Sequence, residues 1–391
     1  MTNYWNIIKD KLQKENGILS IGFSDVIGSG VSGIFWLYIA SIIEPGDYGE
    51  IHYFLGIAGM AHILSMIGSS HALTVFSAKE ERSQSTLFLL SIIPSIFSFF
   101  IIIIIFNRFD AGLLAIGYVI FESVNAVTLG RKFYRKYGKM ILIQKGLTIS
   151  LGILFFYIFG PEGILFGLVL TFIPHLIIFL KEFKNTKISF SLILPKKNFI
   201  VNNYLMTLSG SFGGQIDKII LAPLLGFSLL GNYSLALQIF TILVMFSSIV
   251  FKYLLPQDAS GIANRSLKKI TLVVACIISI LGILVLPRII PVFFPKFVET
   301  VEAISIMSIA VIPETITILY ISKMLGKEKS KFVLIAKLIS LLIIVVGFIW
   351  LGPILGIIGL SIIMVIASLL QAIFLIVVDR IESGGKNVKS I

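Results

Sequence analysis

The sequence predicts an all-α polytopic membrane protein with twelve transmembrane helices in two pseudo-symmetric six-helix lobes. Hydrophobic residues make up 57% of the 391 residues and charged residues only 13%, about half the share of a soluble domain. The apolar residues form twelve runs of roughly 20 residues each, the length needed to cross a bilayer. Lysine and arginine gather in every second loop, as expected when alternate loops face the cytoplasm.

The bulk composition excludes several classes of protein. The single cysteine, Cys276, lies in an apolar run, so neither an intrachain disulfide nor a redox site is expected. The net charge of +12 would suggest nucleic acid for a soluble protein, but here it belongs to the loops between spans, and no nucleic-acid partner is expected. The first apolar run is too long for a signal core and lacks a small-residue cleavage site, so no cleavable signal is expected.

The apolar spans follow one another with short connections on one side of the membrane. That side has connections of only a few residues between most spans, which leaves no room for a domain there. The longest loop on the other side, residues 181–198, is the expected linker between the two lobes. The spans run near 18–43, 51–76, 86–106, 111–130, 140–159, 163–180, 199–225, 233–256, 269–287, 298–323, 332–351 and 354–378.

The loop charges predict the orientation. Basic residues precede span one and follow spans two, four, six, eight, ten and twelve, whereas the opposite loops hold only Arg108, Arg288 and Lys296. Both termini are therefore expected in the cytoplasm and the protein in the cytoplasmic membrane. The expected organisation is a cytoplasmic N-terminal segment (1–17), an N-lobe (18–180), a linker (181–198), a C-lobe (199–378) and a cytoplasmic tail (379–391).

An internal repeat supports the division into two lobes. Spans one and seven both end in a tight loop followed by a glycine, Gly49 and Gly231, 182 residues apart. The sequences FGPEGILFG and LGPILGIIG join spans five to six and eleven to twelve. Six spans per half place both halves in the same orientation, so the repeats are parallel. Chance recurrence of short Gly-Pro hairpins is the alternative.

Polar residues within the spans are the candidate functional groups, because ionised groups inside a membrane are costly and often mark a pathway or binding site. Spans one, four and seven carry polar stripes at helical spacing that would line a cavity between the lobes. The candidates for substrate binding or the cavity wall are Lys218, Asp217, Asn203, Thr207, Ser29, Ser32, Trp36 and Asn125. The candidates for ion coupling are Asp25, Glu122, Asp217, Glu314 and His62.

Structural interpretations of these residues remain open. The small residues of span seven would also permit close helix packing. Asp217 and Lys218 would also serve as a pair that fixes packing, and Asp25 would reach the interface from the end of span one. The chain contains no P-loop, HExxH motif or cysteine–histidine metal spacing, so no catalytic residue, metal or cofactor is expected.

Several stretches, in order along nearly the whole chain, resemble one family. They are EPGDYGE, GGQIDKIILAPLLGFSLLGNYSLA, YLLPQDA, FFPKFVETVEAISIMSI, MLGKEKSK and LGPILGIIGLSI. The chain resembles the polysaccharide-biosynthesis, O-antigen-flippase-like branch of the multidrug/oligosaccharidyl-lipid/polysaccharide (MOP) exporter superfamily, whose fold is MATE-like. The glycine usual in that family near Pro295 is absent, and no arginine lies well inside a span.

The resemblance implies a flippase that moves a glycan linked to a polyprenyl (di)phosphate across the membrane by alternating access. The implied partners are this lipid-linked glycan, membrane lipids, H⁺ or Na⁺ as coupling ion, and glycan-assembly proteins. Lys218 would offset the phosphate charge. The alternatives are a multidrug-type antiporter of the same superfamily, coupled to H⁺ or Na⁺, and, from another class, a membrane-embedded glycan polymerase or transferase.

Overall fold

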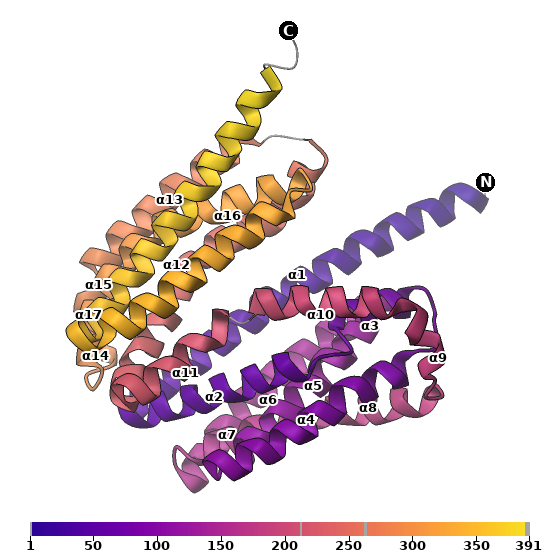
Figure 1. Ribbon diagram of the computed structural model, residues 1–391, viewed down its shortest axis with the longest axis horizontal. Coiled ribbons are helices and arrows are strands. Elements are labelled where there is room, and N and C mark those ends of the chain that lie inside the picture. The colour runs from indigo at the N-terminus through magenta and orange to yellow at the C-terminus, as the bar shows by residue number, and fades with distance from the viewer. Residues whose placement is uncertain (1, 212, 262–263, 388–391) are drawn as a thin grey trace. The chain divides into compact units, whose positions relative to one another are not determined.

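The computed structural model describes residues 2–211, 213–261 and 264–387, and these residues form helices without any strand (Figure 1). The helices of the first half are α1 (Thr2–Ile42), α2 (Pro45–Ser65), α3 (Ser70–Ala78), α4 (Gln84–Phe106), α5 (Phe109–Gly130), α6 (Tyr134–Phe159), α7 (Gly163–Leu170) and α8 (Ile173–Asn185). Those that follow are α9 (Phe190–Ile193), η1 (Leu194–Lys196), α10 (Lys197–Ser211), α11 (Gly213–Leu225), α12 (Phe227–Ala259), α13 (Arg265–Leu284), α14 (Leu286–Phe293), α15 (Val298–Met307), η2 (Ser308–Ala310), α16 (Val311–Gly326) and α17 (Ser330–Asn387).

The apolar runs correspond to these helices. Among the described residues, eight helices are long and apolar enough to cross a membrane, and two bent helix pairs raise the number of spans to ten. In addition, α17 contains two helices joined at Gly356, and α10 and α11 share the seventh predicted run. Each of the twelve predicted runs therefore contains helix in the described part of the chain. Of the predicted cytoplasmic tail, residues 388–391 lie outside the described residues.

Two predicted spans are broken. The second consists of α2 and α3, bent by 50° across residues 66–69, and the sixth consists of α7 and α8, bent by 41°. The turn between the last two spans also differs from the sequence expectation. The helix continues through Pro353 and breaks at Gly356, whose φ of 56° and ψ of −138° suit only glycine. The Gly-Pro dipeptide therefore marks the end of a helix rather than the turn itself.

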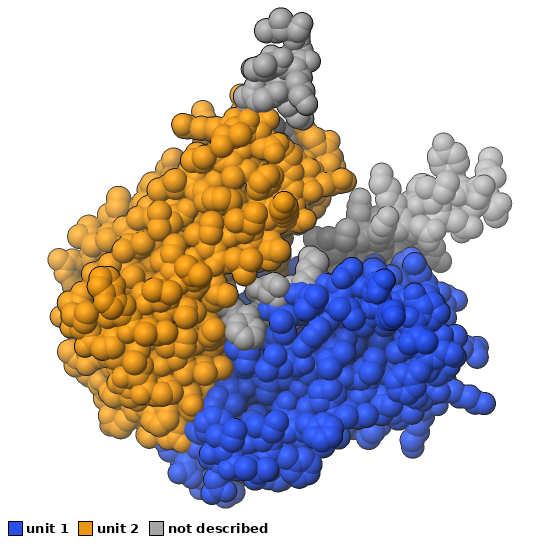
Figure 2. Space-filling model, viewed as in Figure 1, with its two compact units in different colours: residues 1–36, 54–212 blue, residues 37–53, 213–391 orange. Residues whose placement is uncertain are grey.

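The described chain divides into two compact units (Figure 2). Unit 1 contains residues 1–36 and 54–212, and unit 2 contains residues 37–53 and 213–391. The end of α1 and the start of α2 thus pack with the second half of the sequence, whereas α10 packs with the first half. In unit 1 the core includes a stacked pair, Phe88 and Phe179, with ring centroids 4.5 Å apart.

Within unit 2, α2 and α12 cross at the two glycines of the repeat. A Cβ placed on Gly49 would collide with the carbonyl oxygen of Phe227, and a Cβ on Gly231 would collide with that of Pro45. Pro45 and Phe227 each precede their glycine by four residues. The contact is therefore reciprocal: each glycine lies against the backbone one turn before the other.

The two units have the same construction at the end where α5 and α16 stop and basic residues follow. Gly130 ends α5 against the backbone of Thr74, and Gly326 ends α16 against the backbone of Asp258. The next residue in each case is a cation paired with an acid on the last helix of its half. Arg131 Nη1 lies 2.8 Å from Glu182 Oε1, and Lys327 Nζ lies 3.1 Å from Asp379 Oδ1.

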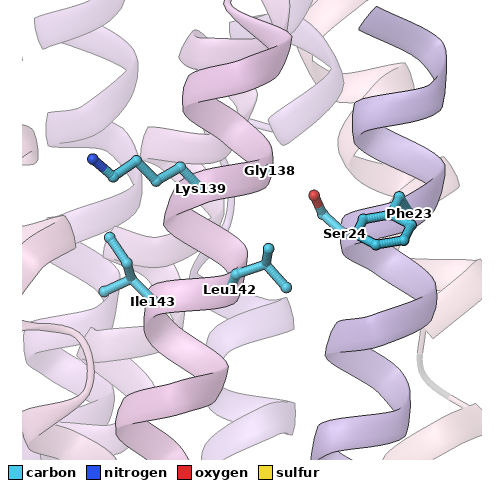
Figure 3. A pocket seen from close by; sticks show the side chains of 6 residues that line it. All are labelled: Phe23, Ser24, Gly138, Lys139, Leu142 and Ile143. Carbon is cyan, nitrogen blue, oxygen red and sulfur yellow. The ribbon is translucent and has the colours of Figure 1, made fainter. Parts of the chain in front are cut away.

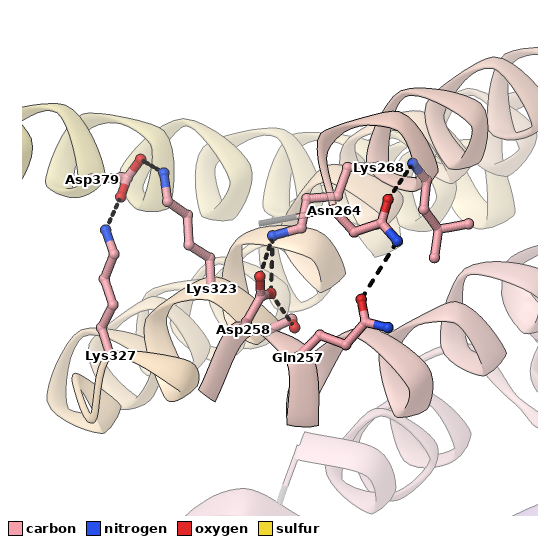
Figure 4. A network of polar contacts seen from close by, with 9 residues as sticks. Gln257, Asp258, Asn264, Lys268, Lys323, Lys327 and Asp379 are labelled. Atoms are coloured by element: carbon pink, nitrogen blue, oxygen red, sulfur yellow. Dashed lines mark hydrogen bonds and ion pairs between the residues drawn. The ribbon is translucent and has the colours of Figure 1, made fainter. Parts of the chain in front are cut away.

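A polar network surrounds this end of unit 2 (Figure 4). Lys268 donates to both oxygens of Asp258 at 2.7 and 2.9 Å, and Ser322 donates to the same carboxylate at 2.7 Å. Lys323 shares Asp379 with Lys327, and both lysines point toward it (Figure 4). The network joins α12, α13, α16 and α17, so charged side chains fix the end of the helix bundle where the apolar core stops.

The turn after α6 and the turn within α17 also correspond. Gly160 has φ 73° and ψ −162°, close to the conformation of Gly356. Three residues beyond each turn, a glycine packs on the preceding helix: Gly163 on the Phe155 carbonyl and Gly359 on the Leu351 carbonyl. The repeat seen in short sequence fragments thus extends to backbone conformation and helix contacts.

Candidate functional site

Two clusters of ionisable groups contain most of the predicted ion-coupling residues. The Glu122 cluster, made of His62, Ser70, His71 and Glu122, lies in unit 1. The Asp217 cluster, made of His52, Asp217, Lys218 and Tyr233, lies in unit 2. Each cluster is described within its own unit.

The Glu122 cluster is centred on a contact between a histidine of α2 and a glutamate of α5. His62 Nε2 lies 2.8 Å from Glu122 Oε2, and the side chains are 16% and 31% exposed. From the start of α3, the hydroxyl of Ser70 donates a hydrogen bond to this carboxylate, and the ring of His71 interacts with it electrostatically. The ring of Tyr118 packs edge-on against His62, with centroids 5.9 Å apart. Two candidates predicted on different spans are therefore in direct contact.

The break between α2 and α3 brings the first turn of α3 to Glu122. Gly68 donates its N–H to Ser91 Oγ at 3.0 Å, and a Cβ on Gly68 would collide with the carbonyl oxygen of Leu87. Ser69 then adopts a left-handed φ of 51°, and α3 starts in a new direction. The first turn of a helix presents N–H groups and a partial positive charge, which favour a nearby carboxylate.

The chemistry available at this cluster is proton exchange. A carboxylate and an imidazole are the side chains that most readily exchange protons, and here they are in contact. Both side chains are largely covered by protein, so their charge state matters energetically. The two groups lie on α2 and α5, so a shift of either helix changes the distance that couples them.

The Asp217 cluster is more enclosed. Asp217 is 6% exposed, and its Oδ1 accepts from the backbone N–H of Lys218 at 2.8 Å. The hydroxyl of Tyr233 also donates a hydrogen bond to this carboxylate. Lys218 is half-buried, donates from Nζ to the carbonyl of Gly214 at 3.2 Å, and lies near enough to His52 to act on it electrostatically. Asp217 and Lys218 therefore interact with groups from α2 and α12 as well as with each other.

Most other candidates make local contacts. Ser29 donates to the Asp25 carbonyl at 2.7 Å, and Asn203 donates to the Phe199 carbonyl at 2.8 Å, both one turn back along their helices. Thr207 donates to the Asn203 carbonyl at 3.0 Å. Asp25 accepts from the Tyr137 hydroxyl at 3.3 Å. These polar groups bond within unit 1, and none of these contacts identifies a ligand.

The remaining candidates are spread over both units. Ser32 and Trp36 are half-buried on α1. Asn125 is buried, and among the described residues its Oδ1 has no hydrogen-bond partner. Glu314 on α16 faces the charge of Lys337 on α17. The polar stripe expected along span seven is divided, because α10 belongs to unit 1 and α11 to unit 2.

The sequence interpretation missed His52 and Tyr233 as neighbours of the charged pair. His52 follows Gly49 by three residues and Tyr233 follows Gly231 by two, so both are near the repeat glycines. The crossing of α2 and α12 at the two glycines brings His52 and Tyr233 to Asp217 and Lys218. Only a prediction of that crossing could have indicated that these four residues are neighbours. Within the described residues, no group of three or more His, Cys, Asp or Glu side chains could hold a metal.

The fold defines a polytopic membrane protein with two helical units and charged groups inside its spans. Solved structures of transporters have this fold. One is an inward-facing multidrug resistance MATE family transporter of the MOP superfamily, at 15% identity over 96% of this chain and 99% of that chain, with a TM-score of 0.73. An outward-facing structure of such a transporter matches at 16% identity over 94% and 96%, with a TM-score of 0.59.

A third similar structure is a MOP superfamily transporter from Pyrococcus furiosus, described as having a binding pocket of reversed polarity. It is 15% identical over 94% of this chain and 95% of that chain, with a TM-score of 0.53. No protein-family profile and no curated protein matches the chain. The chain therefore has the fold of MATE transporters of the MOP superfamily. These structures show the fold, and the expected flippase branch is not shown by them.

Proposed function

We propose that the protein is a secondary exporter of drug-like organic molecules that works by alternating access and is driven by protons. The observation that carries this proposal is the His62–Glu122 pair, 2.8 Å apart beside a broken helix, in a chain with the MATE fold. Broken helices line ion and substrate sites in many transporters. The protein would act in the cytoplasmic membrane with both termini inside.

The coupling follows from differential binding. A proton can drive a conformational change only if the two conformations bind it with different affinity. The pair joins α2 to α5, so its geometry depends on the bend between α2 and α3. Protonation of Glu122 would remove the carboxylate charge that attracts His62, and separation of the two helices would favour this protonation. Substrate would then leave as protons enter.

The test is drug uptake in proteoliposomes of the full chain under an imposed pH gradient. We expect uptake by the unmodified protein and loss of pH-driven uptake in Glu122→Gln, which removes the charge and keeps the shape. The matched control is Glu299→Gln, because Glu299 is an exposed acid in the first turn of α15. Full pH-driven uptake in Glu122→Gln contradicts the proposed site, and uptake driven only by a Na⁺ gradient contradicts proton coupling.

A lipid-linked oligosaccharide is the second candidate substrate. Lys218, a half-buried cation in unit 2, would suit the phosphate of such a carrier, and the sequence motifs resemble flippases of this type. Glycan-assembly proteins would then be partners. Gene deletion followed by lipid analysis distinguishes the two: lipid-linked repeat units trapped on the inner leaflet favour the flippase, whereas unchanged glycan with increased drug sensitivity favours the exporter.

A further inference from the structure

A pocket of about 460 Å³ lies between α1 and α6 in unit 1 (Figure 3). Its volume is within the range of about 300–1,000 Å³ typical of small-ligand sites. It is separate from the Glu122 and Asp217 clusters, and the proposed transport mechanism does not use it. Its lining residues are Phe23, Ser24, Gly138, Lys139, Leu142 and Ile143.

The pocket has a cationic rim and an apolar floor. Lys139 is exposed, and Arg135 lies one helical turn before it on the same face of α6. Leu142 and Ile143 occupy the next turn, and Phe23 is 64% exposed on α1. Leu142 points toward α1, whereas the Lys139 ammonium extends from α6 on the side away from α1 (Figure 3). The Lys139 ammonium and the Leu142 side chain therefore lie on different sides of α6 (Figure 3).

Among the lining residues that the structure describes, none is acidic. The nearest acid in sequence, Asp25, accepts a hydrogen bond from the Tyr137 hydroxyl at 3.3 Å, so its carboxylate faces Tyr137. No acid among the described lining residues therefore cancels the charge of Lys139. Residues 131–139, which form the turn before α6 and its first turns, are rich in basic side chains, which favours a position of this end of α6 at the membrane surface that carries anionic lipids.

We propose that this pocket binds an anionic glycerophospholipid of the leaflet that faces the basic loops. The phosphate would lie on Lys139 at the rim, and one acyl chain would lie against Phe23, Leu142 and Ile143. Charge complementarity favours an anionic headgroup over a zwitterionic one, because the cationic group of a zwitterionic lipid would meet the same lysine. A free phosphate would leave the exposed Phe23 and Ile143 without an apolar partner.

Native mass spectrometry of the delipidated full chain tests the proposal, with phosphatidylglycerol and phosphatidylcholine of the same acyl chains as probes. We expect preferential binding of phosphatidylglycerol. Lys139→Gln should weaken that binding about tenfold, because a charge-assisted hydrogen bond is lost, while leaving phosphatidylcholine unchanged. Lys139→Arg should retain the preference. Phe23→Ala should weaken both lipids, because it removes part of the apolar floor.

The matched control is Lys184→Gln, which removes an equally exposed lysine at the same end of unit 1 but outside the pocket. Equal loss in Lys139→Gln and Lys184→Gln would show attraction to general surface charge and would overturn the proposal. Equal binding of the two lipids by the unmodified protein would also overturn it. Unchanged binding in Phe23→Ala would show that no acyl chain enters the pocket, which contradicts the proposed site. Because Phe23 and Lys139 are exposed, these variants should fold.

Discussion

Replacement of Gly231 by alanine tests the helix crossing in unit 2. A Cβ there would collide with the carbonyl oxygen of Pro45 and lie 2.7 Å from its carbonyl carbon. Both atoms are backbone, so no side-chain rotation relieves the clash, and α2 and α12 must separate. Overpacking of this kind costs about 1–3 kcal/mol, whereas Gly→Ala within a helix gains up to about 1 kcal/mol. We therefore expect net destabilisation of about 1–2 kcal/mol.

The assay is thermal unfolding of the purified protein in detergent, with Gly146→Ala as the control. Gly146 lies inside α6, and apart from its chain neighbours and the nearby backbone of its own helix no described heavy atom lies within 4 Å of the Cβ position. This variant should therefore keep the helix-propensity gain and melt at the same or a higher temperature. Gly231→Ala should melt lower. If both variants shift the melting temperature equally, the backbone contact at Gly231 does not exist as described.

The double variant provides a sharper measurement. Gly49→Ala would produce the reciprocal clash with Phe227 and force the same two helices apart. Once one substitution has separated the helices, the second has less contact left to lose. The double variant should therefore be destabilised by less than the sum of the single variants. Strict additivity would indicate two independent contacts.

Further predictions concern the network and the turns. Asp258→Asn should lower the free energy of unfolding by roughly 1–3 kcal/mol, because Lys268 loses its buried charged acceptor. Thermal unfolding measures this loss, with Asp47→Asn at a half-buried aspartate as the control. A loss in Asp258→Asn no larger than that in Asp47→Asn would contradict the prediction. Gly356→Ala and Gly160→Ala should each cost about 1–3 kcal/mol, because both residues adopt a conformation almost restricted to glycine. Unchanged melting of either would refute the assigned turn.

The composition and apolar runs were sufficient to predict the helices, because a bilayer requires long apolar segments whose backbone groups bond internally. They were insufficient for the breaks. Hydropathy is the same in a straight and a bent span, so the bends at residues 66–69 and before α8 were missed, although Gly68 and Pro174 mark them. The apolar runs 332–351 and 354–378 predict the last turn at Gly352–Pro353, whereas the positive φ identifies Gly356 as the turn.

The candidate residues were identified more successfully than their partners. Burial of charge in a span is visible in the sequence, so His62 and Glu122 could be selected separately. Their contact depends on how α2 bends and packs against α5, which no local pattern encodes. Similarly, Asp217 was evident as an acid in an apolar helix, but His52 lies 165 residues away and approaches only through the glycine crossing.

The reciprocal contact of Gly49 and Gly231 limits how the sequence of this chain can evolve. In a twofold dimer, one surface patch meets its own copy, so residue i of one subunit contacts residue j of the other and the reverse also holds. Here both copies are encoded in one chain, at Pro45–Gly49 and Phe227–Gly231. A single mutation therefore alters only one side of a self-matching contact. At this crossing the two halves of the sequence contact each other through backbone atoms, so the contact does not depend on matching side chains.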